Sequence, residues 1–237
     1  MKKLVLAAVL GVTMLSCKKE PTFEYKYTDQ PQVLTCENSD SKLFNEAYYA
    51  FENAILTQAK NNNKRPNFNI TLDYALRNYI MRAKGHIRIT DYATKEAYDV
   101  FQILKNKDIW NGSQLKSDAA ITECIGNNIS NTTIKGSFNT LRSVESLNPK
   151  LVASTITDDR TIRGQYTDKA LMTYVALDMY YSKFYNTDFS KVEFLVEKEP
   201  TVQPKAKTTQ PEIGKKLNLE VNKTNTEKHG PNDGHNH

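Results

Sequence analysis

The sequence contains none of the short motifs that mark common catalytic sites. A Ser-centred nucleophile elbow, a phosphate-binding loop, a zinc-protease helix motif and a paired-cysteine metal set are all missing from its 237 residues. An internal repeat with a period of about 34 or 40 residues is missing too, which argues against a tetratricopeptide-type array. These absences favour a non-catalytic protein over an enzyme, and we expect no cofactor.

A strong excess of one charge is also missing. The formal net charge is +5, from 32 basic and 27 acidic residues, and the charges are spread evenly along the chain. There is no basic stripe with interleaved aromatic residues, as a nucleic-acid-binding face would have. The composition therefore gives no reason to expect a nucleic-acid partner.

Long hydrophobic runs do not occur at the start of the chain either. The apolar run Leu4–Leu15 has about a dozen residues, whereas a membrane-spanning helix needs roughly 20. Lys2 and Lys3 precede the run, and a small residue, Ser16, follows it. These features are typical of a secretory signal peptide over residues 1–16. Its removal takes away two lysines and lowers the net charge from +5 to +3.

The tetrapeptide Met14-Leu15-Ser16-Cys17 resembles the lipobox of bacterial lipoproteins. The resemblance implies cleavage before Cys17, diacylglycerol on its thiol and an acylated new amino terminus. Three acyl chains would hold the protein at a membrane essentially permanently. The lipobox usually has leucine where this chain has Met14, and an ordinary signal peptide with an incidental cysteine is the alternative. Residues 17–35 are expected to form a lipid-anchored tether.

The residues after the cysteine indicate which membrane. Lys18 stands where many inner-membrane lipoproteins have aspartate, so the resemblance favours the outer membrane. The Ser-Cys-Lys-Lys-Glu start and the abundance of Asn, Lys and Tyr look like lipoproteins of the Bacteroidota. The periplasmic face and the cell surface both remain open.

Cysteine is scarce, with three in the chain. If Cys17 carries the lipid, Cys36 and Cys124 remain as an even pair in a compartment that tolerates disulfides. We expect them to be bonded. The alternative is a pair of buried thiols, because Cys124 lies on an apolar helix face.

Apolar residues recur at steps of three and four between residues 36 and 187. This periodicity predicts six or seven helices, and hence an all-α helical bundle in a domain spanning residues 36–196. The last helix, at about 167–185, is apolar nearly all round, so we expect it at the centre of the bundle. The helix starts are expected at Asp40 or Ser41, Thr71, near Asp91, Ser117, Thr132 and Pro149.

The composition changes after residue 196. Residues 197–237 contain few large apolar side chains, and this tail is expected to be disordered. It ends with His229, His235 and His237 near Asp233. These side chains could wrap Zn²⁺, Cu²⁺ or Ni²⁺, although an incidental polar tail is the plainer interpretation.

Four other residues are candidates for a site. His86 follows a predicted helix end, where it could cap the helix or act as a general base. Asp178 lies in the apolar last helix, either as an acid with a shifted pKa or as a carboxylate paired with Arg or Tyr. Tyr49 and Tyr180 fall off the best apolar stripes, so they are expected to be exposed contacts for a partner.

Two functions are compatible with these patterns. The first is a non-catalytic outer-membrane lipoprotein that serves as an accessory or interaction subunit of a cell-envelope assembly, secretion or uptake complex. It requires an exposed apolar or Tyr-rich patch. The second is a ligand-binding or hydrolytic envelope lipoprotein with a pocket between helices that holds Asp178, His86 or a carboxylate cluster.

Overall fold

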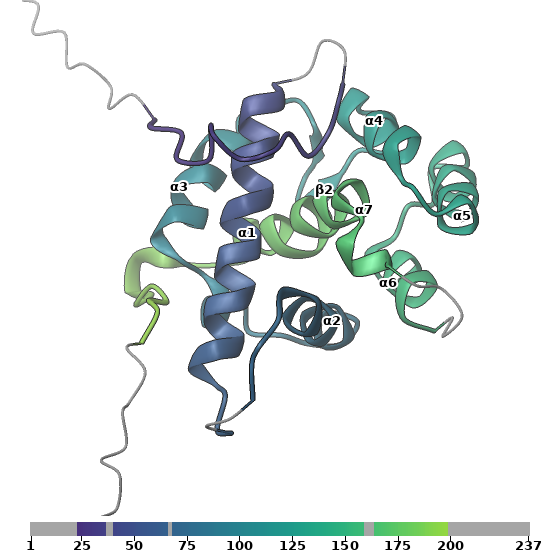
Figure 1. Cartoon of the computed structure of the whole chain (residues 1–237). Coiled ribbons are helices and arrows are strands. Elements are labelled where there is room, and N and C mark those ends of the chain that lie inside the picture. Colours follow the sequence, from purple (N-terminus) through teal and green to yellow (C-terminus); the bar gives the residue numbers. More distant parts are fainter. Residues whose placement is uncertain (1–22, 37–39, 66–67, 159–163, 199–237) are drawn as a thin grey trace, which may run out of the picture. The chain divides into compact units, whose positions relative to one another are not determined.

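The computed structural model describes residues 23–36, 40–65, 68–158 and 164–198. The signal peptide, Cys17 and the three tail histidines lie outside these ranges. The described residues form an all-α bundle, as the periodicity predicts, together with one two-stranded antiparallel sheet (Figure 1). No described helix is long and apolar enough to cross a membrane.

Seven α-helices and one hairpin make up the regular structure of these ranges. The helices are α1 (Ser41–Asn61), α2 (Leu72–Ala83), α3 (Lys95–Leu104), α4 (Ala120–Asn128), α5 (Thr132–Ser143), α6 (Pro149–Asp158) and α7 (Lys169–Tyr174). The hairpin consists of β1 (Trp110–Asn111) and β2 (Gln114–Leu115), whose turn contains Gly112 with φ +59°. Only glycine adopts this left-handed conformation freely, which explains the Asn-Gly turn at this point.

Short polar side chains fix most of the helix starts. Asp40, Thr71, Thr94, Asn131 and Asp168 each accept a hydrogen bond from a backbone N–H in the first turn of the helix that follows. Such caps satisfy donors that have no partner inside the helix.

Two of the predicted starts were wrong. The third helix begins at Lys95 rather than near Asp91, because residues Ile89–Tyr92 form a separate 3-10 turn before the Thr94 cap. The fourth begins at Ala120 rather than after Ser117, and it has no side-chain cap.

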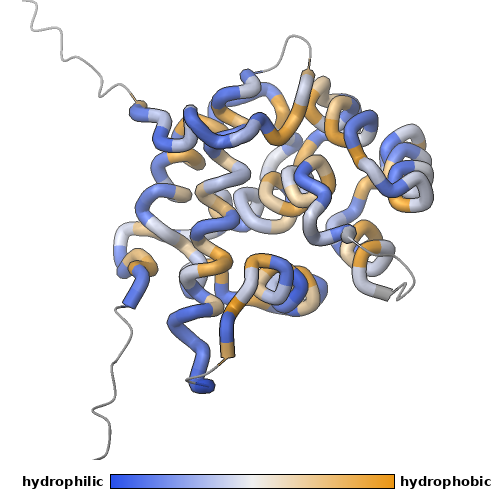
Figure 2. The backbone as a smooth tube through the Cα atoms, viewed as in Figure 1, coloured by the Kyte–Doolittle hydropathy of each residue, from blue (hydrophilic) through white to orange (hydrophobic). Residues whose placement is uncertain are grey.

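The last helical segment lies at the centre of the bundle, as predicted. α7 continues into a π-helical turn, Val175–Tyr180, and then a 3-10 turn, Tyr181–Asn186. Every residue from Ala170 to Tyr181 is buried. Figure 1 shows this segment in green behind α1, with the other helices around it. Along those outer helices, each turn carries both hydrophobic and hydrophilic positions (Figure 2).

The predicted tether extended too far into the fold. Residues 23–36, here called the N-terminal strap, pack against the helices, and Val33 and Leu34 are buried. The buried Glu46 of α1 accepts hydrogen bonds from the backbone N–H groups of Lys26 and Tyr27 at 2.9 to 3.0 Å. The domain therefore begins before residue 36, by residue 23 at the latest.

The disulfide between Cys36 and Cys124 is present, as predicted. It joins the end of the N-terminal strap to α4, with the two Cα atoms 5.7 Å apart. This separation is within the usual range for a disulfide. The bond thus fixes the last residue of the strap to α4, whereas Glu46 holds residues nearer the start of the strap.

Candidate functional site

Asp178 lies in the π-helical turn, inside the core, and is 4% exposed. One carboxylate oxygen accepts a hydrogen bond from the backbone N–H of Leu115 at 2.9 Å, and the other accepts one from the Tyr174 hydroxyl at 2.7 Å. Burial raises the pKa of this carboxyl, and the two hydrogen bonds oppose the rise. Asp178 is therefore the Tyr-paired carboxylate that the sequence offered as one alternative, and it ties the hairpin to the central helix.

The predicted exposure of Tyr180 and Tyr49 was wrong. Tyr180 is completely buried, and its hydroxyl donates to the carbonyl oxygen of Tyr92 at 2.9 Å. It lies at the end of the π-helical turn, where the wider turn moves side chains off the positions that an α-helical period predicts. Tyr49 is covered by the N-terminal strap, whose Pro31 carbonyl accepts a hydrogen bond from its hydroxyl. Neither side chain is available as a surface contact.

A second group of ionisable side chains lies beside Tyr49. The Tyr48 hydroxyl donates to Glu52, and burial raises the pKa of the Glu52 carboxyl. Lys169 donates to the Tyr49 hydroxyl at 2.8 Å, with its ammonium 5.2 Å from the centre of the Tyr49 ring. The Lys169–Tyr49 contact joins α7 to α1, and the Tyr48–Glu52 bond lies within α1, so the polar atoms of all four side chains are engaged within the fold.

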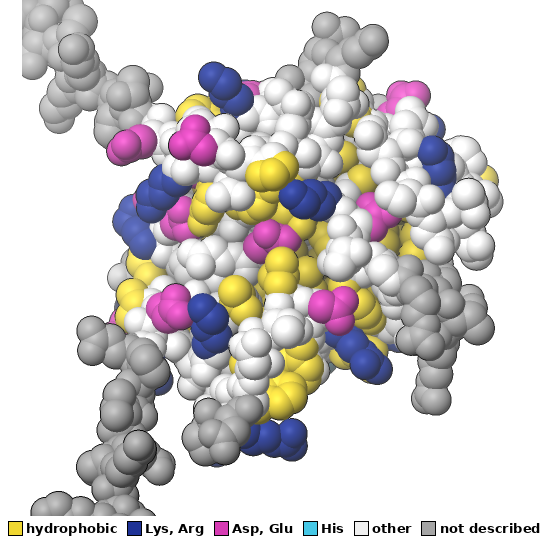
Figure 3. Space-filling model, viewed as in Figure 1, with side chains coloured by type: hydrophobic (Ala, Val, Ile, Leu, Met, Phe, Trp, Pro, Cys, Tyr) yellow, Lys and Arg dark blue, Asp and Glu magenta, His cyan; other side chains and the backbone are white. Residues whose placement is uncertain are grey.

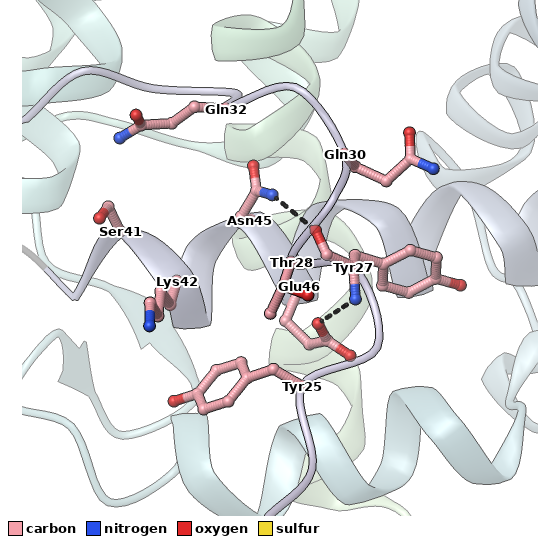
Figure 4. A pocket seen from close by; sticks show the side chains of 9 residues that line it. All are labelled: Tyr25, Tyr27, Thr28, Gln30, Gln32, Ser41, Lys42, Asn45 and Glu46. Atoms are coloured by element: carbon pink, nitrogen blue, oxygen red, sulfur yellow. Dashed lines mark hydrogen bonds between the residues drawn. The ribbon is translucent and has the colours of Figure 1, made fainter.

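A polar hollow of about 380 Å³ lies between the N-terminal strap and the first turns of α1 (Figure 4). In Figure 4 the Glu46 carboxylate and the Asn45 amide point toward the strap backbone and bond to Tyr27. The rest of the lining is uncharged apart from Lys42 at its edge. The two side chains that point inward are thus engaged in holding the strap.

A groove of different character lies between the end of α1 and α2, and we call it the α1–α2 groove. Its volume is about 300 Å³, and an adjoining hollow of about 390 Å³ shares three of its lining residues, Gln58, Arg82 and Tyr92. On the face shown in Figure 3, hydrophobic side chains gather over α2 with basic side chains beside them. The groove is lined by the last turn of α1, the chain after it, one stripe of α2 and Tyr92.

Aromatic side chains at the α1–α2 groove are exposed to an unusual degree for this domain. Phe68 and Tyr74 are 39% and 42% exposed, and their rings meet edge to face with centres 5.1 Å apart. The buried rings of Tyr79 and Tyr92 lie beneath, 5.2 Å from each other. The groove therefore has a rigid aromatic floor with two accessible rings above it.

Three cations surround these rings. Lys64 and Arg65 follow α1, Arg82 lies on α2, and all three are exposed. The Arg65 guanidinium lies 5.9 Å from the centre of the Phe68 ring. Within the described ranges, no carboxylate lies within ion-pair distance of any of the three. The groove thus presents uncompensated positive charge beside apolar surface.

His86 lies at the edge of the adjoining hollow and is exposed. Among the described residues its imidazole has no hydrogen-bond partner, and the backbone N–H groups of Lys84 and Gly85 bond to carbonyls of the last turn of α2, so His86 does not cap that helix through a hydrogen bond. No group of three His, Cys, Asp or Glu side chains in these ranges could hold a metal ion. The tail histidines are outside the described residues, and their metal binding stays a prediction.

The α1–α2 groove was missed at the level of sequence, although two signals for it were present. Tyr74, Asn78 and Arg82 are spaced by four and so form one exposed stripe of α2. One polar residue is enough to end a helix, but here five consecutive polar or basic residues follow the apolar pattern, Asn61-Asn62-Asn63-Lys64-Arg65. Neither signal says by itself that the two segments face each other.

Comparisons with known proteins do not assign the chain to a family. No protein-family model, no curated protein and no solved structure matches the chain significantly. The function is therefore inferred from the residues alone.

Proposed function

We propose that the chain is a non-catalytic, lipid-anchored interaction subunit of the bacterial cell envelope. It is tethered to the outer membrane through Cys17 and docks on a protein of an assembly, secretion or uptake complex. The lipobox-like tetrapeptide supports the anchor, and the disulfide between Cys36 and Cys124 suits an oxidising compartment.

The observation that carries this proposal is the α1–α2 groove. Exposed aromatic rings beside arginines that form no ion pair with another described residue have the composition of protein-binding surfaces, where Tyr, Phe and Arg are enriched. The buried carboxylates Asp178 and Glu46 are engaged within the fold. The groove, in contrast, presents to solvent the residue types that recognise a partner.

The alternative, a ligand-binding or hydrolytic lipoprotein, needs a concave site with a reactive carboxylate. Asp178 is buried and bonded on both oxygens, whereas His86 lies at the surface hollow next to the α1–α2 groove. The carboxylate of Asp178 is therefore engaged within the core, and Asp91, the carboxylate that lines the same hollow as His86, is paired with Arg88. This arrangement favours the interaction subunit.

Affinity purification of the tagged full-length chain from its own detergent-solubilised membranes tests the proposal. We expect an integral envelope protein to co-purify in a fixed molar ratio, identified by mass spectrometry. Recovery of the chain alone, as a monomer, in several mild detergents would contradict the proposal.

A further inference from the structure

We infer that the α1–α2 groove binds an acidic polypeptide segment of a partner, one that carries an aromatic or large aliphatic residue between its carboxylates. The inference rests on the proposed function and specifies the chemistry of the partner. It is carried by the charges of the groove, by the arrangement of its rings and by the amide groups along its walls.

The cations lie on both sides of the groove. Lys64 and Arg65 stand on the chain that leaves α1, and Arg82 stands on α2, so an extended ligand in the groove would pass between them. A guanidinium binds a carboxylate through two parallel hydrogen bonds, and all three cations lack an acidic partner among the described residues. Charge complementarity therefore selects an anionic ligand.

The two exposed rings of the groove are not parallel. Phe68 and Tyr74 meet at an interplanar angle of 68°, so they cannot both stack on one flat sugar or nucleobase. An aromatic or aliphatic side chain can instead pack against the face of one ring and the edge of the other. This arrangement favours a polypeptide over an acidic polysaccharide.

Amide side chains suit the backbone of such a peptide. Gln58, Asn62 and Asn78 line the groove and present both donors and acceptors. The Asn62 side chain already donates a hydrogen bond to the backbone carbonyl of Gln58. The Asn78 side chain makes no hydrogen bond to another described residue. The groove can therefore bond a peptide main chain as well as its carboxylates.

The chain's own C-terminal segment is a poorer occupant, although the last described residues before it contact the end of α1. Lys198 and Val196 bond to Asn61 at the end of α1. The residues that follow, 199–237, contain six lysines against five acidic residues, so they lack the negative charge that the groove requires. The occupant is therefore a separate chain.

Fluorescence anisotropy with a defined probe tests the inference. The probe is a labelled peptide of four Glu-Glu-Phe-Gly repeats, and its control has Gln in place of Glu. The protein is the full-length chain in mild detergent, as wild type, as the groove variant Lys64→Glu/Arg65→Glu/Arg82→Glu, and as Phe68→Ser. A charge-matched control, Lys42→Glu/Lys150→Glu/Lys191→Glu, reverses three exposed lysines outside the groove.

We expect saturable binding of the acidic probe to the wild type and to the control variant. The groove variant, Phe68→Ser and the Gln peptide should each weaken binding about tenfold or more, and added salt should weaken the wild-type complex. Circular dichroism of all variants shows whether they are folded. If the charge reversal unfolds the chain, Phe68→Ser still measures the contribution of the groove to binding.

Four results would overturn the inference. The first is no saturable binding of the acidic probe, and the second is equal weakening by the groove and control variants. The third is binding of oligogalacturonate or anionic lipid vesicles in place of the peptide. If an envelope protein still co-purifies with the groove variant, the inference fails while the proposed function stands. If the wild type is recovered from the membranes without any partner, the proposed function itself is contradicted.

Discussion

Loss of the disulfide between Cys36 and Cys124 should destabilise the domain strongly. The perturbation is the double variant Cys36→Ser/Cys124→Ser, which leaves no unpaired thiol at either position. The bond connects positions 88 residues apart, and a chain-entropy treatment of a loop of that length gives about 4.6 kcal/mol.

The measured loss should be smaller than this upper figure. Unfolded chains retain some compactness, so the variant's loop is less free than the treatment assumes. In the folded state the strap keeps its bonds to Glu46 and the buried side chains of Val33 and Leu34. We therefore expect the free energy of unfolding to fall by about 2 to 4 kcal/mol, and the midpoint of thermal unfolding by roughly 5 to 15 °C.

Urea unfolding followed by circular dichroism measures the difference. A reducing agent should lower the stability of the wild type by a similar amount and leave the double variant unchanged. A difference between wild type and variant below about 1 kcal/mol, with complete oxidation of the wild type verified, would refute the reasoning.

Three further results are expected. Glu46→Gln removes the charged acceptor of the Lys26 and Tyr27 N–H groups, and should cost about 1 to 3 kcal/mol and speed amide exchange in the strap; unchanged exchange would contradict the assigned role. Burial raises the pKa of Asp178 in the folded state, so the contribution of this group to stability should fall as pH rises from about 4 through that pKa, and the stability of Asp178→Asn relative to the wild type should rise from pH 4 to 7 in urea unfolding; a parallel pH dependence of the two would refute this. Cys17→Ala should abolish palmitate labelling and release the protein from the membrane fraction, whereas labelling that persists would exclude lipidation at this residue.

Local patterns were sufficient for the class of fold. Apolar residues at helical spacing around Leu43 and Leu76 predict α1 and α2 because each helix buries one stripe. The all-round apolar character of the last helix predicts its central place for the same reason. An even pair of cysteines sufficed for the disulfide.

Apart from the disulfide, features that depend on contacts between distant residues were not predictable. The N-terminal strap has no period, because Glu46 and Asn45 hold it through its backbone rather than through a repeated apolar face. The π-helical turn shifts the side chain of Tyr180 off an α-helical stripe, so its burial was misjudged. The α1–α2 groove exists only because α2 packs back on α1.

Site-specific photo-crosslinking in living cells tests the central claim most directly. A photoreactive phenylalanine analogue replaces Phe68 at the α1–α2 groove or, as a control, Val144, an exposed residue at the end of α5. The account predicts one discrete adduct with an envelope protein from position 68 and none of that mass from position 144. No adduct from position 68, or the same adducts from both, would contradict it.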